Sequence, residues 1–183
     1  MGAMSRMRVV GWVLLLSGLG CGYRFAPGGA GLPEGVRSVC APVFRNDTAE
    51  PALAQLFTQN FRQELLRAGV LGGGGACEAS VEGIVVGVSS GPTNTADPFF
   101  QPDAQGTVPR IASYRASATV VLRLMRDGRL LSETTVSGSE DFLPGTTNVS
   151  GDVLEVEANR QAALHRLSET LMREGYERLA TSW

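Results

Sequence analysis

Lysine is absent from this sequence: all 16 basic residues are arginines. A codon bias toward arginine in a GC-rich genome would explain this, and so would a need to bind phosphate, which the planar guanidinium holds with two hydrogen bonds. Both explanations stay open. The 18 acidic residues outnumber the basic ones and give a net charge of −2, so the surplus of positive charge typical of nucleic-acid-binding proteins is missing. We expect no nucleic-acid partner.

Histidine and cysteine are also scarce. His165 is the only histidine, and no two of the three cysteines stand at the spacing of metal ligands, which argues against a metal site. Ser89 and Ser90 lack the strand–turn–helix context of a nucleophilic serine. The neighbouring acids Glu140 and Asp141 are typical of a solvated strand end. We therefore predict that the protein is not an enzyme and holds no metal or cofactor.

No apolar run reaches the roughly 20 residues that a membrane-spanning helix needs. The apolar run at residues 9–16 follows a basic N-terminal segment and is followed by small residues and then Cys21. This order predicts a bacterial lipoprotein signal peptide at residues 1–20, with the thiol of Cys21 acylated and the protein tethered to a membrane by lipid. An ordinary secretory signal with an incidental cysteine is the alternative.

Residues 21–36 are rich in glycine and proline and predict a flexible tether, and residues 37–183 are long enough for a single domain.

Export of the protein would determine the oxidation state of the other two cysteines. In an oxidising periplasm Cys40 and Cys77 could form a disulfide, which would close a loop of about 40 residues. Two buried free thiols on neighbouring strands are the alternative.

Hydrophobic periodicity predicts two helices and four strands in the order β-α-β-β-β-α. Apolar residues at three- and four-residue steps mark the helices, and Asp127 and Gly128 suit a two-residue hairpin turn. The fold class is therefore α+β: a two-layer sandwich of a four-stranded mixed sheet with both helices on one face. The predicted elements are strand 37–44, helix 50–68, strand 77–88, strand 114–126, strand 129–141 and helix 152–181.

Alternation over residues 114–126 places Arg115 and Arg123 on the sheet face that the helices leave open. The preceding stretch, residues 89–113, contains several prolines and glycines and is predicted as a long loop. Phe99 and Phe100 lie within it. Because two adjacent exposed aromatic side chains are unfavourable in water, we expect them to insert into this domain, or else to contact a partner or a lipid.

Several segments, in order, resemble one family. The segment Val-Cys-Ala-Pro-Val-Phe-Arg-Asn-Asp-Thr at residues 39–48, followed by Glu50 and Pro51, is the longest of them. On these segments, which together cover most of the mature chain, the sequence resembles the LPS-assembly lipoproteins called LptE. The others are Cys-Gly-Tyr-Arg-Phe at 21–25, Phe-Arg-Gln-Glu-Leu at 61–65, Val-Glu-Gly at 81–83 and Ala-Asn-Arg-Gln-Ala-Ala-Leu at 158–164.

The resemblance implies a two-helix, four-strand sandwich anchored by lipid on the periplasmic face of the outer membrane. It also implies partners: the protein would plug the lumen of the outer-membrane barrel LptD, help that barrel assemble, and receive lipopolysaccharide from the periplasm. The family's lipid-contacting positions are basic residues on the sheet and the proline-bearing loop, which here match Arg110, Arg115 and Arg123.

A second functional hypothesis comes from the segment 39–48. It also resembles the opening of other periplasmic lipoproteins, which activate a cell-wall synthase or contribute to a secretion pore. In both hypotheses the protein acts by binding a partner.

Overall fold

The computed structural model describes residues 31–73, 77–101, 106–144 and 153–181, and over residues 94–101 and 106–112 it describes the backbone alone. The predicted signal peptide, Cys21 and most of the predicted tether lie outside these residues. In chain order the elements are η1 (Pro33–Gly35), β1 (Val39–Cys40), β2 (Arg45–Asn46), α2 (Leu53–Arg67), β3 (Ala79–Gln101), β4 (Gly106–Arg126), β5 (Arg129–Phe142) and α3 (Val153–Thr181).

The strands of this described part form one mixed, five-stranded sheet in the order β1-β3-β4-β5, with β2 also paired to β3. Both β1 and β2 run parallel to β3, and helix α2 lies in the crossover between them, whereas β3, β4 and β5 are antiparallel neighbours. The predicted α+β fold with a mixed sheet is confirmed. The first predicted strand is split into two short pieces, β1 and β2.

Helix α2 causes this split by binding the backbone between β1 and β2. The carbonyl of Ala41 accepts hydrogen bonds from Nε and Nη2 of Arg62, at 2.8 and 2.6 Å. The amide of Phe44 donates to Oγ1 of Thr58 at 2.9 Å. Pro42, between them, has no N–H to offer a strand ladder. The chain therefore leaves β3 over these residues and returns to it at Arg45.

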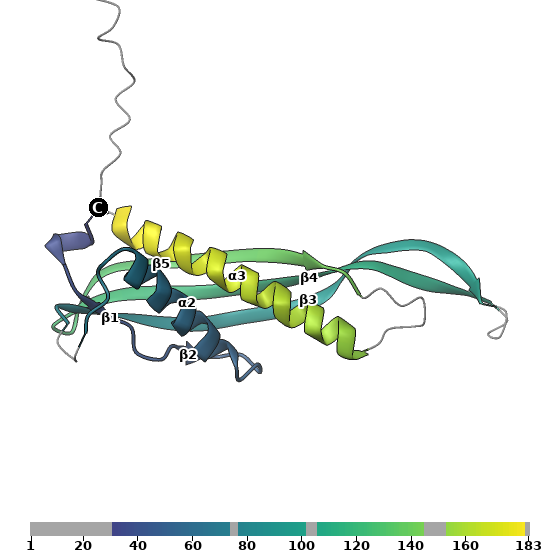
Figure 1. Ribbon diagram of the computed structural model, residues 1–183, viewed down its shortest axis with the longest axis horizontal. Coiled ribbons are helices and arrows are strands. Elements are labelled where there is room, and N and C mark those ends of the chain that lie inside the picture. Colours follow the sequence, from purple (N-terminus) through teal and green to yellow (C-terminus); the bar gives the residue numbers. More distant parts are fainter. Residues whose placement is uncertain (1–30, 74–76, 102–105, 145–152, 182–183) are drawn as a thin grey trace, which may run out of the picture.

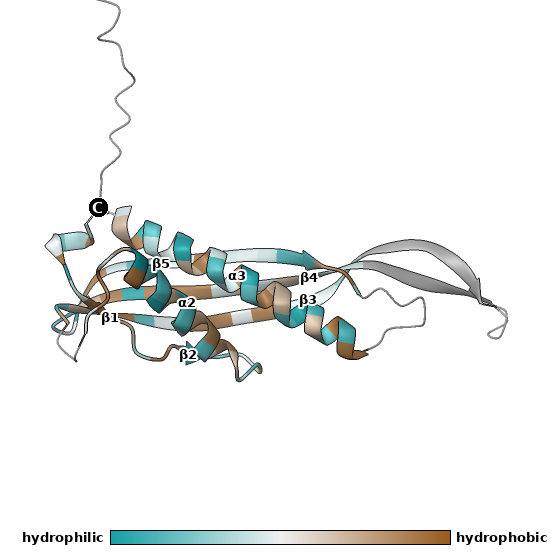
Figure 2. Ribbon diagram, in the orientation of Figure 1, coloured by the Kyte–Doolittle hydropathy of each residue, from teal (hydrophilic) through white to brown (hydrophobic). Residues whose placement is uncertain are grey.

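Both helices lie on the same face of the sheet (Figure 1). Alternate residues of β4 from Ala116 to Leu124 are at most 3% exposed, as expected for the side of the strand that faces the helices. Helix α3 comes so close that a Cβ added to Gly175 would lie 2.4 Å from Cδ1 of Leu122. Apolar stretches of the central strands run beneath the helices (Figure 2). The predicted two-layer arrangement is confirmed.

The packed domain begins earlier than residue 37, where the tether was predicted to end. Leu32 and Val36 flank η1 and are each 3% exposed, so both belong to the core. Between them Glu34 pairs with Arg129 at the start of β5, at 2.5 Å. At least the last residues of the predicted tether are therefore part of the folded domain.

The predicted loop at residues 89–113 is wrong, because β3 and β4 continue through it as a long antiparallel hairpin. We call residues 94–101 and 106–113 the arm. It extends beyond the rest of the sheet (Figure 1), since β5 ends at Phe142, opposite Tyr114. Pro98 and Pro109 both fall in the register irregularity between the pairs Ala96–Arg110 and Phe99–Val108. A bulged ribbon with two free edges tolerates prolines, which is why their number did not prevent strand formation.

Candidate functional site

The sheet face opposite the helices, which we call the open face, is polar. In the strand register Arg123 lies between Glu82 and Glu133, and Arg115 lies between Gly91 and Asp141. Charge is therefore found near the two ends of the face. The rows between are uncharged: Ile84–Val121–Thr135, Gly87–Thr119–Ser137 and Ser89–Ser117–Ser139.

Arg115 is held by Asp141 in a two-point ion pair. Its Nε donates to Oδ1 at 2.6 Å and its Nη2 donates to Oδ2 at 2.9 Å. This hydrogen bonding lowers the pKa of Asp141 and raises the pKa of Arg115 from their ordinary values. Both side chains are about half exposed, at 50% and 52%. The carboxylate thus occupies one edge of a guanidinium that is open to solvent.

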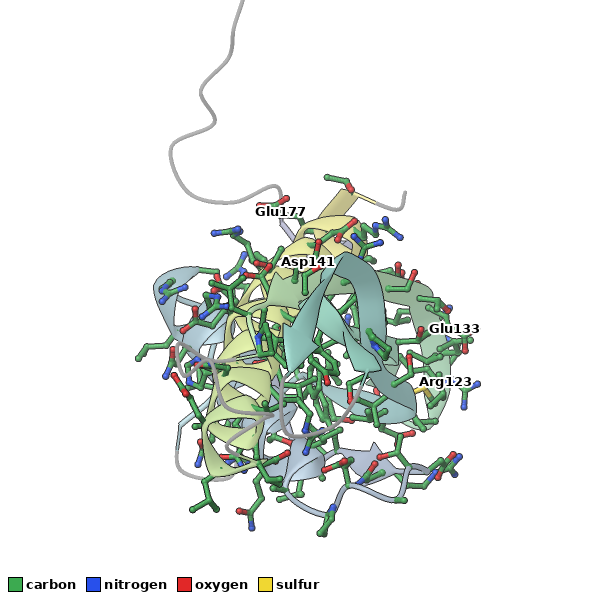
Figure 3. The ribbon with its side chains drawn as sticks, turned by 90° about the vertical axis from the view of Figure 1, so that its right-hand side faces the viewer. Arg123, Glu133, Asp141 and Glu177 are labelled. Atoms are coloured by element: carbon green, nitrogen blue, oxygen red, sulfur yellow. A yellow bond between two sulfur atoms is a disulfide. The ribbon has the colours of Figure 1, made fainter. Side chains whose placement is uncertain are left out.

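The surroundings of Arg123 are more acidic than those of Arg115. Its Nε donates to Oε2 of Glu133 at 2.5 Å, and the two side chains lie together at one edge of the molecule in Figure 3. On the other side of Arg123 the exposed Glu82 makes no side-chain hydrogen bond or ion pair within the described residues. Arg115 and Arg123 lie roughly 26 Å apart along β4, given a rise of about 3.3 Å per residue. One phosphate group therefore cannot bind both.

The other three predicted contact residues lie in the arm. By backbone register Arg110 is opposite Ala96, and Phe99 and Phe100 are opposite Val108 and Thr107. Their side chains lie outside the described part of the structure, so their roles stay predictions.

Cys40 and Cys77 are joined by a disulfide, with their Cα atoms 5.6 Å apart. Cys40 ends β1 and Cys77 precedes β3, the strand that pairs with β1. The bond therefore holds the short edge strand to the start of β3.

Sequence reasoning missed a network that joins α3 to the segment after β2. Arg160, whose side chain is 16% exposed, pairs with Glu50 at 3.1 Å and with Glu157 at 2.8 Å. The Arg160 guanidinium, followed by the amide of Gln161, lowers the pKa of Glu157 to about 2. Asn46 completes the link, because its Nδ2 donates to the carbonyl of Glu50 at 2.6 Å. Glu50, Asn46 and Arg160 all fall in the segments that resemble the LptE family. This shared position was the one signal in the sequence that could have pointed to the network.

No catalytic or metal centre assembles in the described part of the chain. It contains no group of three or more potential metal ligands. His165 lies on the surface of α3, where Nδ1 is 3.5 Å from a carboxylate oxygen of Glu169. None of the helices described here combines the length and the apolar character needed to cross a membrane. The described part of the chain thus combines an open polar face with a projecting arm.

Comparison with known proteins identifies the family of this domain. The model of the LptE family, described as lipopolysaccharide-assembly, matches residues 36–179, so the chain belongs to this family of non-enzymatic lipoproteins. Comparison with curated proteins finds no match to this sequence.

Solved structures resemble the chain more distantly. The PelC dodecamer from Paraburkholderia phytofirmans shares 11% identity, with a TM-score of 0.47 over 83% of this chain and 89% of that chain. A minor lipoprotein from Acinetobacter baumannii shares 9% identity, with a TM-score of 0.44 over 80% and 93%. The rare lipoprotein B from Shewanella oneidensis shares 12% identity, with a TM-score of 0.41 over 79% and 92%. The family assignment rests on the family model alone.

Proposed function

We propose that this chain is an outer-membrane lipoprotein, acylated at Cys21, that plugs and helps assemble the lipopolysaccharide-translocating barrel LptD. The match to the LptE family over residues 36–179 carries the proposal. In this role the protein acts by contact, without catalysis and without a cofactor. Its partners are the barrel, lipopolysaccharide and the outer membrane.

The shape of the domain supports the proposed role as a plug of the barrel. The chain enters the folded domain at Leu32, at the end where α3 terminates, and the arm projects from the opposite end (Figure 1). A lipid anchor upstream of Leu32 therefore leaves the arm free to reach a partner. The lumen of a membrane barrel is polar, which suits a domain whose open face carries serine, threonine and charged side chains. We assign Phe99 and Phe100 of the arm to partner contact.

The open face is the surface that we assign to lipopolysaccharide. Lipid A and the inner core carry phosphates, and this face presents arginine together with uncharged hydroxyl rows. Charge-assisted hydrogen bonds to phosphate are the strongest contacts such a surface offers, at roughly 1.5–3 kcal/mol each.

Affinity purification from gently solubilised membranes tests the function. The full chain carries a C-terminal tag, and a Cys21→Ala version serves as the matched control because it cannot be acylated. We expect the acylated protein to bring down a large outer-membrane barrel and its depletion to reduce lipopolysaccharide at the cell surface. Recovery of the lipoprotein alone would contradict the proposal. Recovery of a cell-wall synthase, with normal surface lipopolysaccharide on depletion, would support the second hypothesis instead.

A further inference from the structure

We propose that the outer edge of β5, from Ser137 to Asp141, binds an extended segment of another protein, which adds to the sheet as one more strand. The contacts are backbone hydrogen bonds, so the edge recognises an extended conformation first and side chains second. The choice of a different protein over a second copy of this chain rests on the lipid anchor of the proposed function, whereas the edge itself does not.

Strand β5 is the last strand of the sheet, and no strand in the described part of the chain pairs with its outer side (Figure 1). From Ser132 to Phe142 it pairs with β4 without a register shift, and this stretch contains no proline and no lysine. Natural proteins usually protect an edge with such residues, with bulges or with short strands. The opposite side of the sheet is protected in this way: β1 and β2 are two residues long, and β3 beyond them has several register shifts and contains Pro92 and Pro98.

The backbone groups of alternate β5 residues point away from β4. Thr135 shows this direction, because its carbonyl accepts a hydrogen bond from Nη1 of Arg178 in α3 at 2.8 Å. In an antiparallel ladder the N–H and C=O of one residue point to the same side of the strand, and the side changes with each residue. The register is regular here, so Ser137, Ser139 and Asp141 share the direction of Thr135. Their N–H and C=O groups therefore face outward.

Helix α3 caps this edge at two points and leaves the stretch between them free. At one end Arg178 binds the carbonyl of Thr135, and at the other end Nδ2 of Asn159 donates to the carbonyl of Leu143 at 3.1 Å. Between them lie residues 137–141, which we call the free edge. Its outward backbone groups make no hydrogen bond within the described residues, and the three residues that carry them are exposed. An added strand of about five residues would pair with all of these groups.

The surroundings of the free edge favour uncharged polar side chains on the partner segment. On the open face the free edge presents two serine hydroxyls. The charges nearest to them are already paired: Asp141 with Arg115 at 2.6 Å, and Glu140 with Arg166 at 2.8 Å. A charged partner residue would lose water without meeting an unpaired opposite charge. The partner segment is therefore extended, free of proline and uncharged where it passes the two serines.

A second copy of this chain does not suit the free edge. Two identical edges pair antiparallel about a two-fold axis, so the two domains would run in opposite directions. The chain enters the domain beside the start of β5, since Glu34 of η1 pairs with Arg129. In such a dimer one arm would point away from the membrane and the other back toward it. The anchor at Cys21 requires the same direction for both copies, so we assign the free edge to a different protein.

Photo-crosslinking in living cells identifies the occupant. The photoreactive amino acid p-benzoylphenylalanine replaces Ser139 in the full acylated chain, and in the matched control it replaces Ser117. The two serines lie in one row of the open face, but Ser117 is on β4, which has a paired strand on each side. We expect Ser139 to crosslink to one protein several times more efficiently than Ser117. Mass spectrometry should place the crosslink in a segment without proline.

Two variants separate the backbone of Ser139 from its side chain. Ser139→Pro removes an N–H that the sheet does not use, and an edge strand tolerates proline at such a position. Ser139→Ala keeps the N–H and removes the hydroxyl. We expect Ser139→Pro to weaken binding of the purified partner by about tenfold, the effect of one backbone hydrogen bond. Ser139→Ala should change it less than about twofold. Urea unfolding confirms that both variants fold.

Hydrogen exchange of the wild-type complex gives a readout that needs no variant. The amides of residues 137, 139 and 141 should exchange quickly in the free protein and slowly in the complex. The amides of residues 136, 138 and 140 point toward β4 and should exchange slowly in both. This alternation distinguishes an added strand from a ligand that only covers the open face.

Crosslinking of Ser139 to the barrel LptD, with alternating protection, would support both the free edge and the proposed function. The same protection with a crosslink to a different protein would support the free edge and count against the barrel as its partner. Equal crosslinking from Ser139 and Ser117, a crosslink to a second copy, or unchanged exchange at residues 137, 139 and 141 would overturn the free edge as a strand-binding site. Recovery of the barrel in those cases would leave the proposed function intact. Equal losses for Ser139→Pro and Ser139→Ala would show a side-chain contact and also overturn strand addition.

Discussion

The ring of Phe44 lies directly against the backbone of Gly83, at a position where no larger residue fits. A Cβ built on Gly83 would be 2.3 Å from Cδ2 of Phe44. On its other side Phe44 packs against Phe61 of α2, with ring centroids 5.7 Å apart. The ring is therefore enclosed between the central strand β3 and the first helix, and it closes the core where the edge strand is interrupted.

Gly83→Ala should destabilise the domain by about 1–3 kcal/mol, because the added methyl must displace the buried ring of Phe44, which packs against Phe61. Urea unfolding of the mature domain measures this. Gly87→Ala on the same strand is the control, since a Cβ there would meet nothing within 4 Å. An equal loss of stability in both variants would contradict the packing argument and indicate a general cost of alanine in β3.

The disulfide between Cys40 and Cys77 should contribute substantially to stability. The two residues are 37 apart in sequence, and the chain-entropy model gives about 3–4 kcal/mol for closing such a loop. Cys40→Ser combined with Cys77→Ser should lower the urea midpoint by a corresponding amount. A reducing agent should lower the midpoint of the wild type toward that of the double variant and leave the variant unchanged. A midpoint of the wild type that does not respond to reduction would contradict this.

The sheet shows what could be predicted from sequence and what could not. Alternation over residues 114–126 assigned the faces of β4 correctly, because burial on one side imposes a period of two. The ion-pair partners of Arg115 and Arg123 could not be predicted. The two-residue turn aligns Arg126 with Arg129, and that register continued without interruption would place Arg123 opposite Ser132. An irregularity between Leu124 and Met125 shifts the pairing to Glu133. Sequence periodicity gives no signal for it.

The prediction of a loop at residues 89–113 was wrong for a different reason. Prolines and glycines in residues 89–113 argue against a central strand, which needs hydrogen bonds along both edges, but they do not exclude a strand with a free edge. Whether a strand is central depends on which neighbours extend alongside it. Strand β5 ends at Phe142, so β4 has a free edge before Tyr114. This is a property of the assembled sheet, and a single segment does not reveal it.

Lowering the pH should remove the stabilising effect of the ion pair between Glu157 and Arg160 within α3. Arg160 lowers the pKa of Glu157 from its ordinary 4.5 to about 2. A carboxylate with a depressed folded-state pKa stabilises the fold above pH 4.5, and that contribution is lost as pH falls toward 2. The side chain of Glu157 is 42% exposed, so solvent screening limits the effect to about 0.3–1 kcal/mol.

Unfolding free energies measured between pH 6 and pH 2 test this ion pair, with the wild type compared to Glu157→Gln. The difference between the two should shrink as the pH falls. Glu82→Gln is the control, because that carboxylate makes no ion pair within the described residues. A difference that stays constant across the pH range would show that Glu157 contributes through packing.

The two helices are joined by a buried polar contact. Nδ2 of Asn60 in α2 donates to Oγ of Ser168 in α3, and these residues are 4% and 0% exposed. Asn60→Ala should cost about 1–3 kcal/mol, since the buried hydroxyl of Ser168 loses its donor and keeps only its hydrogen bond to the carbonyl of His165. Combined with Ser168→Ala, the loss should be smaller than the sum of the single losses by about 0.5 kcal/mol or more. Strictly additive losses would show that the contact carries no coupling energy.

Replacing Phe99 and Phe100 tests whether the arm contributes to the stability of the fold or to the binding of a partner. The arm has no third strand in the described part of the chain, and a two-stranded ribbon by itself is only marginally stable in water. The fold of the domain should therefore not depend on it. Replacing both phenylalanines by serine should leave the urea midpoint of the mature domain unchanged and reduce the amount of barrel that co-purifies from membranes. The paired control replaces Thr95 and Gln101 of the arm by alanine and should leave both measurements unchanged. A lowered midpoint in the phenylalanine variant, with co-purification restored at a lower temperature, would show instead that the two rings belong to the core of this domain and that the barrel binds elsewhere.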